Sequence, residues 1–300
     1  MPRVSVAVLI VNFKAYGHLQ RCLKSLDPCL DPGDEVVVVD NESDPRLLQQ
    51  ALADHPRVTR LPSSKNLGFA AAVNLAARNC RSTYLFLLNP DTELQGPVLR
   101  TLESWLEHHP SDGVVGPRVV NADGTVQASA RRFPDVTTLL GGRSSSLTRV
   151  FPNNWFSERN LIGRAATEPI RVDWVSGACL MTSRELFERM GGLDESFFLY
   201  WEDADYCGRA ALAGRVTMYL PAVCVKHEVG VSAVHDRGLA IREFHASAYR
   251  LYLKSASPAG RLAAPLVRVV LGLRCRLCLV GARFAGTDVA AAKATDQVRG

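Results

Sequence analysis

Short apolar runs alternate with amphipathic segments along the first half of the chain. Apolar residues are continuous in residues 4–11 and 84–88, a pattern typical of strands that are buried on both faces of a parallel sheet. Strands are predicted at residues 4–11, 35–39, 58–61, 84–88 and 114–115, and helices at residues 19–26, 47–53, 70–79 and 97–108. This alternation predicts an α/β fold with a mostly parallel sheet and helices on both faces.

The second half begins with a segment of a different kind. Residues 131–169 are rich in Ser, Gly, Asn, Arg and Pro and have no clear periodicity, which predicts a long irregular loop. Beyond the loop, strands are predicted at residues 172–181, 216–219 and 223–226, and helices at residues 183–190 and 201–212. Ser183 is the expected cap of the first of these helices.

The end of the chain is basic. No acidic residue occurs between Glu243 and Asp288, and from Pro265 onward the pattern predicts a helix. The arginines at positions 268, 276 and 283 fall on one side of that helix, because it turns once in about 3.6 residues. Such a helix suits an anionic membrane surface. A helix that packs on the core and turns its basic face to water fits the pattern equally well.

Composition narrows the function classes. The chain has 300 residues, of which 47% are hydrophobic and 22% charged, which is typical of a globular protein. The net charge of +5 is modest, and no basic stripe with interleaved aromatic residues occurs, so we expect no nucleic-acid partner. Cys275 and Cys278 form a C-x-x-C motif, but no second Cys pair or His pair accompanies it, so a zinc site is not expected. No signal peptide or spanning segment is evident, and a cytoplasmic protein is expected.

The most informative chemical signal comes directly after the apolar run at residues 84–88. There the chain reads Asn89, Pro90, Asp91, and open α/β sheets bind ligands at the carboxyl ends of their strands. A carboxylate in that place can bind a hard divalent cation, and the cation can bind a diphosphate. Because the same residues are also ordinary in turns, the motif gains weight only together with the rest of the chain.

Other strand ends carry polar residues as well. Asn12 closes the first strand, and Asp40 and Asn41 close the second. Asn66 and Gly68 precede a helix that contains Asn74, and a glycine at a helix start lets the backbone approach a ligand closely. The motifs of dinucleotide-binding folds and P-loops are absent. The edge of the sheet is therefore predicted to bind a ligand by another arrangement.

Two further features suggest catalytic groups. Glu202 and Asp203 are adjacent acids next to Trp201 at a helix start, and their mutual repulsion and partial burial should raise one pKa, as suits a general base. Simple capping of the helix is the alternative explanation. His227 follows a predicted strand and is a candidate second ligand for a metal at Asp91.

In their order along the chain, these motifs resemble an inverting family 2 glycosyltransferase of the GT-A type, in its rhamnosyltransferase-like branch. The matching segments are residues 8–13, 38–44, 66–74, 88–92, 174–178, 191–195, 201–205 and His227. The resemblance implies a Rossmann-like GT-A domain in residues 1–250, with a nucleotide-sugar-binding half (1–125) and an acceptor and catalytic half (170–250). Residues 251–300 would form a basic, amphipathic helical tail.

The resemblance also implies roles for individual residues. Asp203, with Glu202 beside it, would deprotonate the acceptor hydroxyl, and Asp91 with His227 would bind Mg²⁺ or Mn²⁺ on the diphosphate. The expected nucleotide-sugar contacts are Asn12, Asp40, Asn41, Asn66, Gly68, Asn74, Asn89 and Asp91, and the expected acceptor contacts are Trp174, Gly177, Asp194 and Trp201. Asn89 stands where the family often has the first Asp of a D-x-D motif, so it is expected to contact sugar, ribose or metal-bound water.

The implied activity is transfer of L-rhamnose from dTDP-L-rhamnose to a lipid-linked or polysaccharide acceptor in cell-envelope biosynthesis. The implied lipid-linked acceptor is N-acetylglucosaminyl-diphospho-polyprenol, used at the inner face of the plasma membrane. A galactofuranosyltransferase or another nucleotide-sugar transferase is the alternative within the family. An inactive nucleotide-sugar-binding protein is the alternative from another class. A nucleotidyltransferase would need a basic glycine-rich loop, which residues 12–17 do not supply. The oligomeric state is not specified by these patterns.

Overall fold

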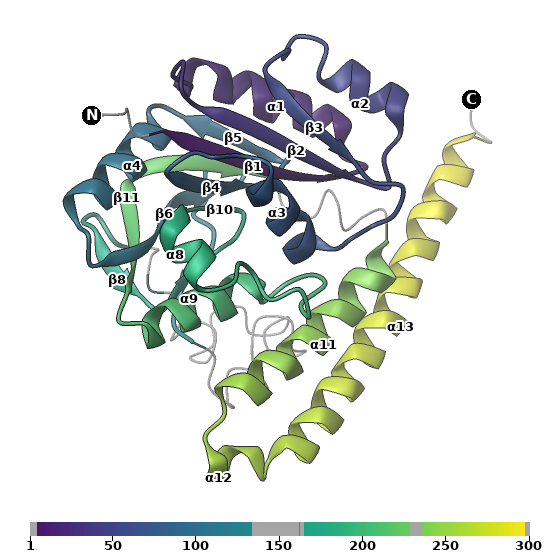
Figure 1. Cartoon of the computed structure of the whole chain (residues 1–300). Coiled ribbons are helices and arrows are strands. Elements are labelled where there is room, and N and C mark those ends of the chain that lie inside the picture. Colours follow the sequence, from purple (N-terminus) through teal and green to yellow (C-terminus); the bar gives the residue numbers. More distant parts are fainter. Residues whose placement is uncertain (1–4, 134–161, 163–164, 229–235, 298–300) are drawn as a thin grey trace.

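A large sheet forms the centre of the molecule (Figure 1). The computed structural model describes residues 5–133, 162, 165–228 and 236–297, with side chains up to residue 282. Within these residues the nine-stranded sheet has the order β3-β2-β1-β4-β10-β6-β11-β5, and β8 pairs with β11. Its strands are β1 (Val6–Phe13), β2 (Glu35–Asn41), β3 (Val58–Pro62), β4 (Tyr84–Leu88), β5 (Thr92–Gln95), β6 (Asp112–Val120), β8 (Ile170–Val172), β10 (Cys179–Ser183) and β11 (Val216–His227). The strands β7 (Ala130–Arg131) and β9 (Trp174–Val175) form a separate pair.

Most strands of the large sheet run in one direction. β1, β2, β3, β4, β6 and β11 share that direction, and β5, β8 and β10 run the other way. The predicted α/β fold with a mostly parallel sheet is therefore confirmed. The carboxyl ends of β1, β2 and β4 lie side by side, which brings their polar terminal residues to one edge of the sheet.

Helices cover both faces of the sheet, as predicted. The helices are α1 (Tyr16–Leu26), α2 (Pro45–Ala51), α3 (Phe69–Arg78), α4 (Val98–His108), α8 (Arg184–Arg189), α9 (Glu202–Leu212), α11 (Arg237–Ser255), α12 (Pro258–Arg261) and α13 (Ala264–Gln297), with a 3₁₀ turn at Asp27–Cys29. Side chains alternate along β1, so Leu9 packs with apolar residues of α3 and α9, whereas Val8 and Ile10 pack with those of α1 and α4. Burial on both faces explains why the β1 sequence is continuously apolar.

Two expectations for the second half were wrong in detail, and two elements elsewhere were missed. The single strand expected at residues 172–181 is three strands, β8, β9 and β10, because the backbone of residues 176–178 leaves the ladder. There, Ser176 N–H donates to Ser129 O and Gly177 N–H donates to Asp203. The two strands expected at residues 216–226 are one strand, β11, whose register shifts between Leu220 and Cys224. The short strand β5 and the long helix α11 were not predicted.

The tail forms a helical hairpin beside the main body (Figure 1). The helix predicted from Pro265 is confirmed as α13, which packs on α11 through Val267 and Leu271 against Ala248 and Tyr252. The expected domain boundary at residue 250 falls within α11. Most of the predicted loop at residues 131–169 lies outside the described residues. In the part of the chain that the structure describes, no helix combines the length and the apolar composition that crossing a bilayer requires.

Candidate active site

Two adjoining pockets open at the carboxyl edge of the parallel strands. The smaller pocket has a volume of about 210 Å³ and lies between the ends of β1, β2 and β4 and the start of α11. The larger pocket has a volume of about 800 Å³ and lies over the start of α9. The residues that line both are Phe69, Asn89, Leu199, Tyr200 and His227. A molecule in one pocket can therefore touch a molecule in the other.

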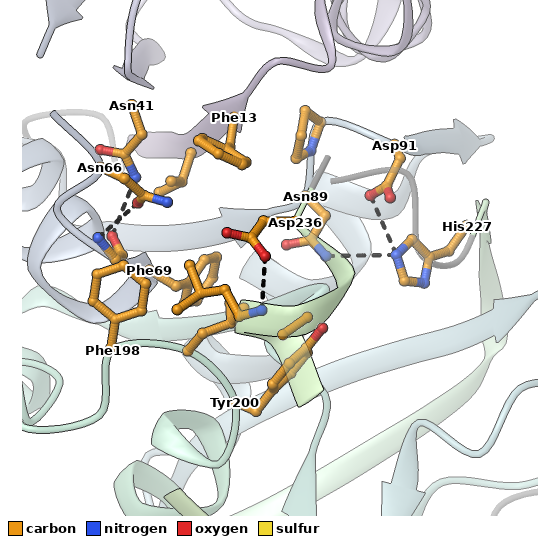
Figure 2. A pocket seen from close by; sticks show the side chains of 16 residues that line it. Phe13, Asn41, Asn66, Phe69, Asn89, Asp91, Phe198, Tyr200, His227 and Asp236 are labelled. Atoms are coloured by element: carbon orange, nitrogen blue, oxygen red, sulfur yellow. Dashed lines mark hydrogen bonds and ion pairs between the residues drawn. The ribbon is translucent and has the colours of Figure 1, made fainter. Parts of the chain in front are cut away.

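The loop before α3 forms one wall of the smaller pocket (Figure 2). The Asn41 amide holds the end of this loop next to α3, since it donates to Gly68 O at 3.3 Å and accepts from Leu67 N at 3.2 Å. Asn66 Oδ1 accepts from Gly68 N at 2.9 Å. Gly68 has φ +83°, and a Cβ there would lie 2.5 Å from Phe198 O. Only glycine fits this position, and the three predicted residues Asn41, Asn66 and Gly68 do meet at one pocket.

Asn12 and Asp40 also meet, but behind that pocket. They are register partners on β1 and β2, both are fully buried, and Asn12 Nδ2 donates to Asp40 Oδ1 at 2.6 Å. Tyr16 Oη donates to Asp40 Oδ2 at 3.1 Å. Neither Asn12 nor Asp40 is among the residues that line the smaller pocket. In the structure they join the ends of two strands, and their expected contact with the nucleotide stays a prediction.

Two other predicted residues lie away from both pockets. Asn74 binds the turn before α9, because its Oδ1 accepts from Leu193 N at 2.9 Å and its Nδ2 donates to Leu193 O at 2.8 Å. Asp194 accepts from Lys254 Nζ at 2.8 Å and from Ser196 N at 2.9 Å. Burial raises the pKa of Asp194, but these hydrogen bonds outweigh it and lower the pKa to about 2. In the structure Asn74 and Asp194 thus make contacts within the protein, and their expected ligand contacts stay predictions.

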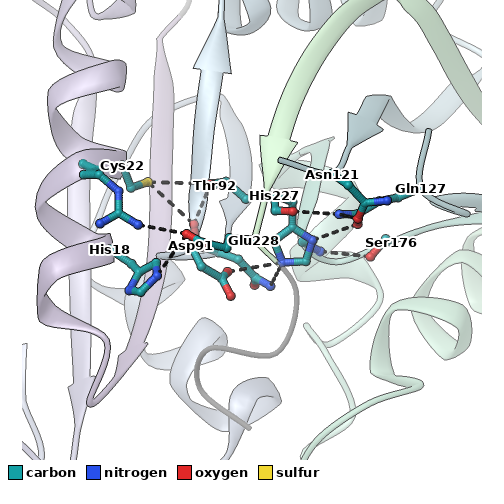
Figure 3. Close-up of polar contacts among 12 residues, drawn as sticks. His18, Cys22, Asp91, Thr92, Asn121, Gln127, Ser176, His227 and Glu228 are labelled. Atoms are coloured by element: carbon teal, nitrogen blue, oxygen red, sulfur yellow. Dashed lines mark hydrogen bonds and ion pairs between the residues drawn. The ribbon is translucent and has the colours of Figure 1, made fainter. Parts of the chain in front are cut away.

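Asp91 and His227 face each other where the two pockets meet (Figure 3). The Asp91 Oδ1 and His227 Nε2 atoms are 3.2 Å apart. Gln127 determines which imidazole nitrogen carries the proton. Its Nε2 donates to His227 O at 2.7 Å and to Asn121 Oδ1 at 2.8 Å, so its Oε1 is the atom that lies 3.0 Å from His227 Nδ1. Nδ1 then donates to Oε1, and in the neutral form of the imidazole the lone pair is on Nε2.

This pair fits a divalent cation. His227 Nε2 lies next to the carboxylate, and the buried Asp91 Oδ1 receives no hydrogen bond from the residues that the structure describes. A neutral imidazole and an ionised carboxylate at this distance offer two ligand atoms to one cation. The described residues contain no group of three or more His, Cys, Asp or Glu side chains suited to a metal. Two protein ligands suit Mg²⁺ or Mn²⁺, which take their remaining ligands from phosphate and water. Asn89 borders the pair, with its Nδ2 3.5 Å from His227 Nε2.

Asp203 occupies the larger pocket at the first turn of α9. Its Oδ2 accepts from Gly177 N at 2.8 Å and its Oδ1 accepts from Ala204 N at 2.8 Å. Burial raises the pKa of the Asp203 carboxyl, and these two hydrogen bonds oppose the rise. The helix begins after two residues in left-handed conformation, Tyr200 at φ +67° and Trp201 at φ +72°. Such conformations cost energy and persist only where the surrounding structure holds them, and they are found most often at functional sites.

Glu202 lies beside Asp203 but has different surroundings. It is 5% exposed, and burial first and the Asp203 charge second raise its pKa well above the usual range. Its Oε2 has no hydrogen-bond partner among the described residues. Of the two acids, Glu202 therefore holds its proton more tightly, and Asp203 loses its proton more readily. An ionised Asp203 in this pocket can act as a general base.

Aromatic side chains form the far wall of the larger pocket. The ring centroids of Trp174 and Trp201 are 5.9 Å apart, and the Arg131 guanidinium lies 5.0 Å from the centre of the Trp174 ring. Trp201 Nε1 donates to Phe244 O at 3.2 Å, which ties this wall to α11. Trp174, Trp201 and Gly177 thus line one pocket together with Asp203, and their contact with the acceptor stays a prediction.

Sequence reasoning missed some residues of the site. Gln127 lies in an irregular stretch after β6, and nothing in its neighbourhood along the chain signals a contact with His227. Phe198 and Asp236 line the smaller pocket, and Phe244 lines the larger one. Phe244 and Asp236 belong to α11 and its cap, which the sequence pattern did not reveal.

Comparisons with known proteins agree with this geometry. Residues 7–191, more than half of the chain, match the family model "Glycosyl transferase family 2". The chain therefore belongs to glycosyltransferase family 2 and is an enzyme of that class, as its motifs predicted.

Two relatives cover most of the chain. It is 30% identical to the N-acetylglucosaminyl-diphospho-decaprenol L-rhamnosyltransferase of Mycobacterium tuberculosis, over 81% of this chain and 82% of the relative. It is 26% identical to the rhamnosyltransferase WbbL of Escherichia coli, over 83% and 90% of the two chains.

The fold has solved counterparts. The mannosyltransferase PcManGT of Pyrobaculum calidifontis, in complex with GDP-Man and Mn²⁺, aligns with a TM-score of 0.56 at 18% identity, over 96% of this chain and 80% of that one. GalNAc-T7 with UDP, GalNAc and Mn²⁺ also aligns with a TM-score of 0.56, at 17% identity, over 75% and 44%. The fold is thus of the GT-A type.

Proposed function

We propose that this enzyme transfers L-rhamnose from dTDP-L-rhamnose to a lipid-linked or polysaccharide acceptor, with inversion at the anomeric carbon. One observation carries the proposal. The Asp91–His227 pair and the Asp203 carboxylate open into adjoining pockets that share the wall formed by Asn89 and Tyr200. A diphosphate at the pair and a hydroxyl at Asp203 would thus lie on opposite sides of one sugar ring.

The smaller pocket suits the donor. Asn66 and Gly68 would offer an amide and closely approaching backbone to the nucleoside, Asn41 would hold their loop in place, and the buried Asn12–Asp40 pair would support that wall from behind. The diphosphate would lie against Asp91 and His227, where a bound Mg²⁺ or Mn²⁺ would neutralise the charge that develops on the leaving group.

The chemistry needs one base. Asp203 takes the proton of the acceptor hydroxyl while the hydroxyl oxygen forms a bond to the anomeric carbon. The bond from that carbon to the β-phosphate oxygen breaks, and the nucleotide diphosphate leaves with the bonding electrons. Attack from the face opposite the leaving group inverts the configuration, by analogy with inverting glycosidases. Glu202, which keeps its proton, can donate a hydrogen bond in the same pocket.

The sugar and the acceptor follow from the relatives. Two proteins that share most of this chain's length are rhamnosyltransferases, and the mycobacterial one acts on a diphospho-decaprenol carrier according to its name. An N-acetylglucosaminyl-diphospho-polyprenol acceptor would lie with its lipid in the inner face of the plasma membrane. The enzyme would then serve cell-envelope biosynthesis at that surface.

A donor screen tests the proposal. Purified enzyme with Mg²⁺ is offered dTDP-L-rhamnose, UDP-galactofuranose and other nucleotide sugars, with and without acceptor, and release of nucleotide diphosphate is measured. We expect acceptor-dependent release from dTDP-L-rhamnose. Donor binding without release under all conditions would instead indicate an inactive binding protein.

The metal pair has its own test. Asp91→Asn should abolish the metal-dependent gain in dTDP affinity measured by calorimetry with and without Mn²⁺. Asp123→Asn is the matched control, because Asp123 is an exposed residue outside both pockets. If Asp91→Asn keeps the full gain, Asp91 is not a metal ligand.

A further inference from the structure

Large apolar side chains form an exposed row along one face of α13. Leu266, Val269, Leu273, Leu277 and Val280 are between 49% and 68% exposed. They recur every three or four residues, so they share one side of a helix with about 3.6 residues per turn. Leu262, just before the helix, is 85% exposed and continues the spacing. These residues are named the α13 apolar row here.

The row faces away from the protein. The opposite side of α13 carries Val267 and Leu271, which are buried against Ala248 and Tyr252 of α11. The helix already has an apolar face for packing on the core, and the α13 apolar row is a second one. A contiguous exposed row of this kind marks an interaction surface, because isolated exposed leucines are ordinary but an aligned set is not.

The charges beside the row are all positive. Arg261, Arg268 and Arg276 are exposed, and no acidic residue occurs between Glu243 and Asp288. A second copy of α13 would bring arginines against arginines, with no acid on this part of the helix to pair with them. An anionic bilayer supplies negative charge for the arginines and an apolar interior for the row.

We propose that α13 lies in the plane of an anionic membrane, with the α13 apolar row inserted at the boundary between headgroups and acyl chains. Arg276, which flanks the row, extends its apolar stem along it and holds its guanidinium group at the lipid phosphates, whereas Arg268, farther round the helix, attracts the anionic leaflet through its charge. The binding then has two parts, an electrostatic part that salt screens and an apolar part that salt leaves in place.

The position of the helix relative to the site gives this contact a purpose. α13 packs along α11 (Figure 1), and Phe244 of α11 lines the larger pocket, where its carbonyl holds Trp201. A membrane-bound α13 would keep the larger pocket close to the leaflet, within reach of a lipid-linked acceptor. This purpose rests on the proposed function, whereas the membrane contact itself does not.

Co-sedimentation with phosphatidylglycerol-containing vesicles tests the contact, with full-length protein at low and high salt. The wild type should bind, and part of the binding should persist at high salt. The triple variant Leu266→Ser, Leu273→Ser, Leu277→Ser should lose the salt-resistant part, with a fall in partition coefficient of at least about tenfold. Arg268→Gln with Arg276→Gln should lose mainly the salt-sensitive part. Leu212→Ser is the matched control, because Leu212 is 91% exposed but lies on α9.

Several results would overturn the proposal. Equal binding by the wild type and the triple variant, or complete release of the wild type by salt, would show that the α13 apolar row does not insert into the membrane. A wild type that ignores vesicles but forms dimers that the triple variant does not would assign the row to a second copy. Nucleotide release with a short soluble acceptor should be unchanged in the triple variant, so a failure of membrane binding and a failure of the transferase reaction are separately visible.

Discussion

The His227 imidazole faces the Asp91 carboxylate because β5 and β11 pair antiparallel, with Thr92 directly opposite His227. Asp91 immediately precedes β5, and Glu228 N–H donates to Asp91 O at 2.9 Å, which extends the ladder past the pair. The short strand β5 therefore determines whether the two ligands meet. Strand pairing holds them more rigidly than a free loop would, as a metal site requires.

Gln127 is expected to control metal affinity through the imidazole. Gln127→Leu removes the group that accepts a hydrogen bond from His227 Nδ1. Either nitrogen of the imidazole can then carry the proton, and the orientation of the His227 ring is no longer fixed. We expect about 10–100-fold weaker Mn²⁺-dependent binding of dTDP by calorimetry. Gln127→Glu keeps an acceptor at this position and should retain most of the affinity. Equal affinities of the wild type and Gln127→Leu would show that the contact does not orient His227.

Asp203→Asn is expected to lose turnover but not donor affinity. The base acts in the chemical step, so kcat should fall at least about 10²-fold while the KM for donor stays near its normal value. Glu202→Gln preserves the shape and hydrogen-bonding capacity of a protonated Glu202 and should cost less. A nearly normal kcat for Asp203→Asn would indicate that Glu202 is the base instead. Asp205 is a poor substitute, because it is paired with Arg209 at 2.7 Å and lines neither pocket.

The pH profile should reflect the burial of Asp203. Burial raises its pKa above the ordinary value for an Asp, and the base works only when it is unprotonated. The rate should therefore fall as pH drops through a value above that ordinary one. The kcat profile measures this limb, and Asp203→Asn should lose it. An acid limb in the wild type at the position of an exposed carboxyl would argue against a buried base.

Gly68→Ala is expected to damage the donor pocket. A Cβ at residue 68 would lie 2.5 Å from Phe198 O. It would push the loop away from Phe198 and break the 2.7 Å hydrogen bond that Phe69 N–H donates to Phe198 O. Gly124 has almost the same φ, +82°, but nothing within 4 Å of an added Cβ. Gly124→Ala should cost about 1 kcal/mol of stability from backbone strain alone. Gly68→Ala should cost more and should also weaken dTDP binding, and the comparison of unfolding and calorimetry separates the two effects.

Much of the fold could be predicted because burial leaves a direct signal in the sequence. Strands β1 and β4 are buried on both faces and read as continuous apolar runs, so both could be predicted. The features that were missed depend on contacts between distant segments. β5 is only four residues long, and β11 is interrupted by a register shift, so neither shows a clear period in the sequence.

The sequence could indicate which residues belong to the candidate site, but not how their side chains are arranged. Asn74 and Asp194 belong to motifs that resemble the family, but a motif does not reveal which of its side chains turn toward a ligand and which bind the neighbouring backbone. The hydrogen bond from Gly177 N–H to Asp203 and the contact of Gln127 with His227 join segments that lie far apart in the sequence. Such contacts require the folded chain.

The central claim is that Asp203 and the Asp91–His227 pair act on one sugar from opposite sides. Nuclear magnetic resonance of the product formed from dTDP-L-rhamnose and an N-acetylglucosaminyl acceptor tests it most directly, because it reports both the sugar transferred and its anomeric configuration. We predict a rhamnosyl product whose configuration is opposite to that of the donor. A product that retains the donor configuration, or donor consumption that yields no glycoside, would contradict it.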